Sequence, residues 1–242
     1  MHLPGAFTPE QLTGRTAMHV VPLPGSGLLV HRDVVEPFVA MRAAAARDGI
    51  DLQPVSAFRD FTRQCLIWNE KCRGQRPLLD REGRVLDPAA LDADALVDAV
   101  LIWSALPGAS RHHWGTDLDV IDAAAIPEGY RPQLVPAEFA PGGPFAALDG
   151  WLDRHAMAFG FHRPYATPRG GVQPEPWHVS HARLAGQALG ALSVELLAEA
   201  LRMAGLEAGD AVLARLPELH GRYVRNVDPF RGSPQDSQAF LK

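Results

Sequence analysis

Two carboxylates stand beside and within an apolar run that predicts a buried strand, and this combination constrains the fold more than any other feature of the sequence. Asp117 and Asp119 share one face of the strand predicted over 118–121, because side chains alternate along a strand. An acid is costly to bury unless it is paired or bound to a metal. His112 lies shortly before them, ahead of a glycine. The segment therefore predicts either an ion pair with an arginine or part of a metal site.

A second histidine stands close to an acid in the sequence EPWH, residues 175–178, at the start of a strand predicted over 175–182. Alone, Glu175 could simply cap a surface strand. Together with the first segment it completes a set of two histidines and one aspartate, His112, His178 and Asp119, which suits zinc. Three protein ligands leave a fourth position open for water, as in catalytic sites, and Glu175 could take a proton from that water.

Hydrophobic periodicity predicts helices around a small antiparallel sheet, which is an α+β domain. Pro54 marks its predicted strand as an edge or a bulge, because proline lacks the N–H that a central strand needs. The predicted helices cover 34–48, 60–73, 91–104, 144–158, 186–204 and 209–224, and the predicted strands cover 51–57, 118–121 and 175–182. Residues 74–89 suit a loop or hairpin, 123–143 a loop rich in proline and glycine, and 225–242 a polar tail.

Length and charge restrict the classes of function. The 242 residues suffice for one sizeable core, or for one catalytic domain with an extension, and two full domains would be cramped. The net charge of -5 argues against nucleic acid or an anionic membrane as the main partner, and no stretch approaches the roughly 20 apolar residues that span a bilayer. The N-terminal residues lack the pattern of a signal peptide, so we expect the cytoplasm, with the periplasm as the alternative. Cys65 and Cys72 lie about 10 Å apart along a predicted helix, so we expect two reduced thiols.

Three segments resemble motifs of the D-Ala-D-Ala carboxypeptidase family, which includes vancomycin-resistance D,D-carboxypeptidases and L,D-carboxypeptidases. SRHHWGTDLD at 110–119 resembles S-x-H-x-x-G-x-(A/D)-x-D, and EPWH at 175–178 resembles E-x-W-H. SAFRDFTRQ at 56–64 resembles S-x-(Y/F)-R-x-x-x-x-Q. WLDRHAMAFGFHRPY at 151–165 also resembles a family segment that ends in G-F-x-x-x-Y. The resemblance covers about residues 35–182, with the motifs in the family's order.

The resemblance implies a hedgehog/D,D-peptidase-like fold, with a central antiparallel sheet flanked by helices. It implies a catalytic domain over 1–182 and a C-terminal helical extension, 183–242, packed on the same domain. The family's residue roles carry over to the matching positions. His112, Asp119 and His178 would bind zinc, Glu175 would be the base, Arg59 would stabilise the oxyanion or hold the substrate, and Ser110, Gln64, Ser56 and Trp177 would contact the substrate.

Two residues of the first motif need a separate interpretation. Asp117 stands where many members of the family have Ala, and we expect it to orient a ligand histidine. His113 adds a second imidazole beside His112. Its side chain should point away from that of His112, so we expect a structural role.

The implied activity is that of a zinc-dependent metallocarboxypeptidase that removes a C-terminal D-amino acid, D-Ala, from peptidoglycan-derived peptides through a zinc-bound water activated by Glu175. A cell-wall-lytic endopeptidase with the same site is one alternative, although the chain shows neither a wall-binding module nor a basic surface. A non-catalytic hedgehog-type zinc-binding module is another, and the presence of both Glu175 and Arg59 argues against it. The choice between D,D and L,D cleavage stays open, as does the oligomeric state.

Overall fold

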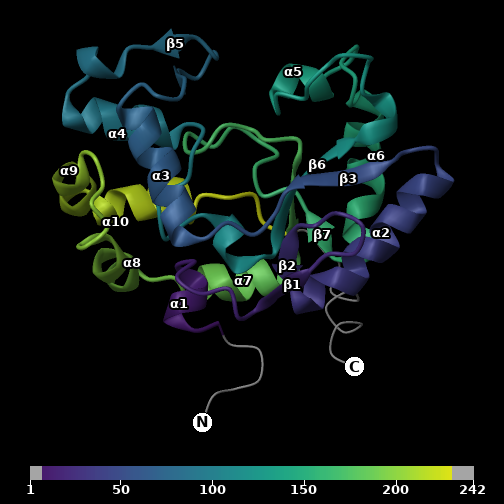
Figure 1. Cartoon of the computed structure of the whole chain (residues 1–242), viewed down its shortest axis with the longest axis horizontal. Helices are drawn as coiled ribbons and strands as arrows, with labels where there is room; N and C mark the ends of the chain where they lie inside the picture. The colour runs from purple at the N-terminus through teal and green to yellow at the C-terminus, as the bar shows by residue number, and fades with distance from the viewer. Residues whose placement is uncertain (1–6, 231–242) are drawn as a thin grey trace.

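A four-stranded antiparallel sheet lies at the centre of the protein, as the computed structural model of residues 7–230 shows (Figure 1). Its strands are β3 (Leu52–Ser56), β6 (Asp117–Asp122), β8 (His178–His181) and β7 (Phe161–His162), in that order across the sheet. Each neighbouring pair is antiparallel. Helices flank this sheet, so the expected α+β class is confirmed.

Strand β3 lies at one edge of the sheet, which is where Pro54 can be accommodated. Its pairing with β6 is regular up to Pro54 and shifts between Pro54 and Ser56. A proline cannot donate to the sheet, so an edge strand with a local irregularity tolerates it best. The prediction of an edge or a bulge at this residue is confirmed in both respects.

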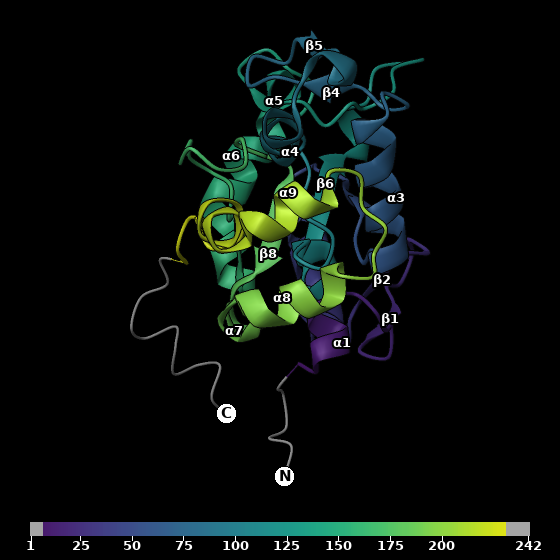
Figure 2. The same ribbon diagram turned by 90° about the vertical axis from the view of Figure 1, so that its left-hand side faces the viewer.

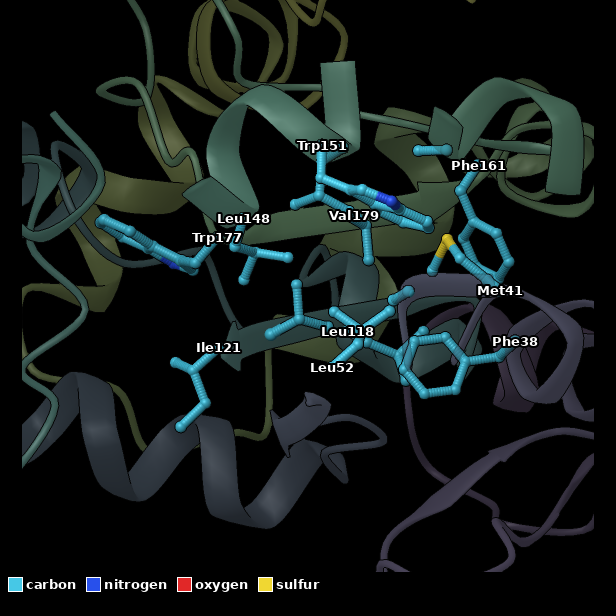
Figure 3. Close-up of a cluster of buried hydrophobic side chains, with 14 of the residues drawn as sticks. Phe38, Met41, Leu52, Leu118, Ile121, Leu148, Trp151, Phe161, Trp177 and Val179 are labelled. Carbon is cyan, nitrogen blue, oxygen red and sulfur yellow. The ribbon is translucent and has the colours of Figure 1, made fainter. Parts of the chain in front are cut away.

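One hydrophobic core forms where helices α2 (Val35–Arg47) and α6 (Ala146–His155) pack against the sheet (Figure 3). Gly49 follows α2 with φ +81°, a conformation that favours glycine and ends the helix as expected. The indole of Trp151 donates to the Asp48 carboxylate at 2.8 Å and ties the two helices together. The side chains that meet in this core are Phe38, Met41, Leu52, Leu118, Leu148, Trp151, Phe161 and Val179.

A second core lies on the other side of the molecule, between α3 (Phe61–Cys72), α4 (Ala93–Leu101) and the C-terminal helices (Figure 2). Trp68 of α3 is fully buried in it, and its indole donates to the carbonyl of Glu207 at 3.0 Å. The C-terminal helices are α7 (Ala182–Ala191), α8 (Val194–Leu201), α9 (Gly209–Ala214) and α10 (Leu216–Leu219), followed by a π-helical turn at His220–Val224.

The prediction of a single helix over 186–204 is wrong. The chain breaks after α7, and Ser193 begins α8 by accepting a hydrogen bond from the backbone N–H of Leu196 at 3.2 Å. Serine competes for backbone hydrogen bonds and therefore favours such a cap over the interior of a helix. The helix predicted over 209–224 divides in the same way, with Pro217 in the first turn of α10.

Taken singly, no helix within residues 7–230 is long and apolar enough to cross a membrane. The pair α7–α8 passes that test of length and composition when joined, but the two helices meet at a bend of 77°.

The remaining elements refine the predicted loops and strands. Strand β8 (His178–His181) is shorter than the strand predicted over 175–182. Residues 175–177 form a turn instead, in which the His178 N–H donates to the Glu175 carbonyl at 3.1 Å. Residues 74–89 contain the expected hairpin, β4 (Leu78–Leu79) with β5 (Val85–Leu86). The sequence patterns missed α1 (Pro9–Leu12), the hairpin of β1 (Val20–Pro22) and β2 (Leu29–His31), and α5 (Pro136–Phe139).

Candidate active site

The pairing of β6 with β8 brings the two sequence motifs together. Asp119 lies directly opposite His178 in the register of the two strands. His112 comes from the 3-10 turn Arg111–Trp114, which ends at Gly115 with φ +66°. A side chain at Gly115 would lie only 2.6 Å from Val20, so both conformation and space require glycine there. His112, Asp119 and His178 each offer a ligand atom, and these atoms lie within 4.8 Å of one another.

The three side chains are buried, yet their polar atoms are incompletely paired. Nε2 of His112 lies 3.3 Å from Asp119, and Nδ1 of His178 lies 3.1 Å from the same carboxylate. Within residues 7–230, neither Asp119 Oδ1 nor His178 Nδ1 has a hydrogen-bond partner of good geometry. Buried polar atoms without partners are costly, and a bound cation would satisfy them. The donor set of two imidazoles and one carboxylate fits zinc.

Electrostatics within the cluster favour a charged carboxylate. Burial alone would raise the pKa of Asp119, but His112 and His178 hold that pKa well below its usual range. An ionised carboxylate with a vacant lone pair is the form that binds a metal cation.

Asp117 holds the ring of His178 from the opposite side. Its carboxylate lies 3.0 Å from Nε2 of His178 and also accepts from Arg111 at 2.7 Å and from the Thr116 hydroxyl at 2.6 Å. Because Asp117 occupies Nε2, the other nitrogen of His178 is the one directed at Asp119. Asp117 is thus in the orienting position expected from the sequence, and it also forms the ion pair with an arginine that was the simpler interpretation of this segment.

Glu175 and Arg59 line one cavity of about 590 Å³ together with His112, Asp119 and His178, the three side chains that are called the metal cluster below. The Glu175 carboxylate lies 3.4 Å from Nδ1 of His178. Burial lowers the pKa of Arg59, while the nearby carboxylates of Asp119 and Glu175 act in the opposite direction. A carboxylate and a guanidinium therefore line the same cavity as the atoms that would hold the metal.

Two of the expected substrate contacts, Gln64 and Ser56, hydrogen-bond to Arg59. The amide of Gln64 is fully buried; it accepts from Arg59 at 2.9 Å and donates to the Ala105 carbonyl at 2.8 Å. The hydroxyl of Ser56 accepts from Arg59 at 3.3 Å. Neither side chain is among the residues within 7–230 that line this cavity, and both hold the Arg59 guanidinium. Ser110 and Trp177 do line the cavity, as a substrate contact requires.

The backbone of Arg59 is fixed to the same turn that carries His112. Arg59 N–H donates to the His112 carbonyl at 3.2 Å, and the Arg59 carbonyl lies 2.5 Å from Nδ1 of His113. Nε2 of His113 accepts from the Gly108 N–H at 3.1 Å, so its Nδ1 carries the proton and donates. The structural role expected for His113 is therefore specific: it joins Arg59 to the metal-site turn.

The cavity has walls that motif analysis missed. Tyr165 packs its ring against His178 with centroids 5.1 Å apart, and burial raises the pKa of its hydroxyl to about 12. The final tyrosine of the 151–165 match was the available signal for this residue. The tip of the β4–β5 hairpin, 81–83, and the segment 133–137 also line the cavity, and no motif singled them out.

Comparisons with known proteins find a family model, curated relatives and solved structures to which this chain is similar. Residues 27–184 match the family model described as VanY: D-alanyl-D-alanine carboxypeptidase. Two Haemophilus influenzae proteins described as uncharacterized are similar: one is 45% identical over 103 residues, 41% of this chain and 70% of that protein, and the other is 33% identical over 121 residues, 49% and 92%. Among solved structures, VanYB in complex with D-Alanine-D-Alanine is 22% identical, with TM-score 0.49 over 78% of this chain and 91% of that chain. The LdcB LD-carboxypeptidase is 18% identical, with TM-score 0.49 over 76% and 78%.

Proposed function

Because the chain belongs to the VanY family of D-alanyl-D-alanine carboxypeptidases, we propose that it uses zinc to hydrolyse the C-terminal D-amino acid from peptidoglycan-derived peptides. The observation that carries this proposal is the position of Glu175. Its carboxylate lies 3.4 Å from a nitrogen of the metal cluster and faces the same cavity as Arg59. A base, a cation and a metal site converge there on one space large enough for a peptide end.

His112, Asp119 and His178 would hold the zinc. Their donor types fit this metal, and three protein ligands correspond to a catalytic site with one open position. Bound zinc supplies Lewis-acid chemistry, lowering the pKa of a water molecule and polarising the scissile carbonyl. Asp117 keeps the ring of His178 in the orientation that points Nδ1 at the site.

The protein's own side chains supply the proton transfer and the charge stabilisation. Glu175 accepts a proton from the attacking water and then donates it to the amine of the departing D-amino acid. Arg59 stabilises the negative charge that develops on the former carbonyl oxygen, and its guanidinium is already held for this purpose by Gln64 and Ser56. Ser110 and Trp177 contact the peptide within the cavity.

A non-catalytic zinc-binding module is the less favoured candidate. Such a module needs neither a base nor an oxyanion partner, whereas Glu175 and Arg59 both face the metal cluster in this protein. The cytoplasmic location remains part of the proposal, and it favours soluble, recycled wall peptides over the polymer as substrates.

The test uses the zinc-loaded protein with muropeptides that carry penta- and tetrapeptide stems, and it follows release of D-Ala by mass spectrometry. We expect release from at least one of the two, and the stem that reacts separates D,D from L,D cleavage. Glu175→Gln is the matched control: it should retain zinc and lose activity by about 10²–10⁴-fold. Equal turnover by Glu175→Gln, or no release from either stem, would refute the proposed reaction.

A further inference from the structure

The loop between β7 and β8 carries Glu175, and the C-terminal end of the described chain is bonded to that loop. The matched family segment ends at residue 184, so this end of the chain lies outside it. Asn226 donates to the Arg169 carbonyl at 2.8 Å and accepts from the Arg169 guanidinium at 2.9 Å. Arg222 donates to the Gly170 carbonyl at 3.0 Å. The extension therefore does more than cover a hydrophobic core.

Asp228 contacts the chain on both sides of Tyr165, a residue that lines the cavity. Its backbone N–H donates to the Pro164 carbonyl at 2.8 Å. Its carboxylate accepts from the Thr167 backbone N–H at 2.8 Å and from the Thr167 hydroxyl at 2.7 Å. Partial burial raises the pKa of Asp228, but the hydrogen bonds from Thr167 outweigh this and lower it. One residue of the extension thus fixes the backbone on both sides of Tyr165.

Tyr165 links the backbone that Asp228 holds to both Glu175 and His178. The Glu175 N–H donates to the Tyr165 carbonyl at 2.9 Å, so the backbone that presents the base is bonded to the backbone that Asp228 holds. The Tyr165 ring also packs edge-on against His178. A shift of the Tyr165 peptide would therefore move Glu175 relative to the metal cluster.

We propose that Asp228 is a positioning residue for Glu175, acting through Pro164 and Thr167 on the Tyr165 peptide. This inference rests on the proposed function, because it assigns Asp228 a place in that reaction. Misplacing a catalytic group by about 1 Å can lower a rate on the order of 10²-fold. Residues 185–230 of the extension then support the reaction although none of them lines the cavity.

The test measures kcat, KM, zinc content, Tm and amide hydrogen exchange in Asp228→Ala, Asp228→Asn and Thr167→Val. In Asp228→Ala we expect kcat to fall roughly 10- to 100-fold, with KM and zinc content close to wild type. The Glu175 amide, followed by NMR, should exchange faster. Asp228→Asn keeps one acceptor oxygen for the Thr167 N–H and should restore part of the rate. Thr167→Val loses only the hydroxyl bond and should show a smaller loss of kcat.

Glu218→Gln provides the control, because Glu218 is an exposed carboxylate of the same extension that pairs with Arg215. It should leave kcat and the exchange of the Glu175 amide unchanged. Wild-type kcat and wild-type protection of that amide in Asp228→Ala would overturn the proposal. If Asp228→Ala unfolds, the two milder variants decide: lower Tm with unchanged kcat and unchanged exchange would also overturn it. Amide exchange needs no substrate, so absence of D-Ala release would contradict the reaction without deciding the role of Asp228.

Discussion

At the scale of single residues, the proposed ligand set depends on His178, whose Nε2 lies 3.0 Å from Asp117 and whose Nδ1 lies 3.1 Å from Asp119. We expect His178→Ala to lose most of its zinc, because only one histidine and one carboxylate of the cluster remain. Elemental analysis of the purified variant measures this directly. A full equivalent of zinc in His178→Ala would show that the ligand assignment is wrong.

A substitution at Asp117 tests whether its contact with His178 contributes to zinc affinity. Asp117→Asn preserves the size of the side chain but removes the negative charge that His178 Nε2 and Arg111 face. We expect zinc affinity to fall about 10- to 100-fold, as for other partners of metal-bound histidines. Competition with a chromophoric chelator measures the affinity. An unchanged zinc Kd would mean that the carboxylate serves only the buried pair with Arg111.

Arg59 is held by a fork of two hydrogen bonds that lysine cannot reproduce. One arm reaches Gln64 and the other reaches Ser56. We expect Arg59→Lys and Arg59→Ala to retain zinc and Tm but to lose about 10²–10³-fold in kcat/KM. Arg63→Lys, at an exposed position in the same segment, is the control. Full activity of Arg59→Lys together with unfolding of Arg59→Ala would make this arginine a purely structural residue.

The motifs predicted which residues gather at the site better than they predicted what each one touches. His112, Asp119, His178, Glu175 and Arg59 all face one cavity, as their residue types and order suggested. Gln64 is different because its role depends on the burial of one face of α3, which a motif does not encode. Tyr165 and Asp228 depend on contacts between distant segments, and local sequence carries little information about these.

At the scale of elements, the break between α7 and α8 shows that a local capping hydrogen bond can determine where a helix begins. Apolar periodicity runs on through 186–204, yet the Ser193 hydroxyl caps a new helix. We expect Ser193→Ala to lower the free energy of unfolding by about 1 kcal/mol, measured by urea denaturation. Ser193→Thr keeps a capping hydroxyl and should lose less. Equal stability of Ser193→Ala and wild type would show that packing alone sets this bend.

Periodicity succeeded for long helices and failed for short elements for a physical reason. Helix α2 presents a buried stripe over several turns, whereas β1, β2 and α5 have three or four residues each. Such short elements are stabilised by contacts with the rest of the fold. An example is the β1–β2 hairpin, whose His31 N–H donates to the Gly115 carbonyl in the site turn at 2.8 Å.

At the scale of the whole molecule, we expect histidines that folding removes partly from water, such as His31, to make stability sensitive to acid. Burial lowers the pKa of His31 to about 4, with Asp33 raising it and His19, Arg32 and His181 lowering it further. The usual value in an unfolded chain is about 6.5, so the unfolded state binds more protons between these values. The contribution of His31 to stability is therefore full above about pH 6.5 and is lost as the pH falls toward about 4.

The variant His31→Gln should therefore lose less Tm than wild type between about pH 6.5 and pH 4.5. Release of zinc in acid affects both proteins, so the difference between the two Tm profiles isolates the imidazole. Calorimetry across this pH range measures both profiles. Parallel profiles would mean that His31 titrates alike in the folded and unfolded chains.

Different segments of the chain line the cavity. Two of the side chains proposed to bind the metal, Asp119 and His178, come from paired strands, while other parts of the cavity lining come from a hairpin tip at 81–83 and from the segment 133–137, which leads into α5. Surface segments of this kind tolerate substitution far better than a packed sheet. Substitutions in these two segments can therefore change the selectivity for peptide substrates while the proposed catalytic residues stay the same. A combinatorial library randomised at residues 81–83 and 133–137 would search for new peptide preferences while the proposed catalytic residues stay unchanged.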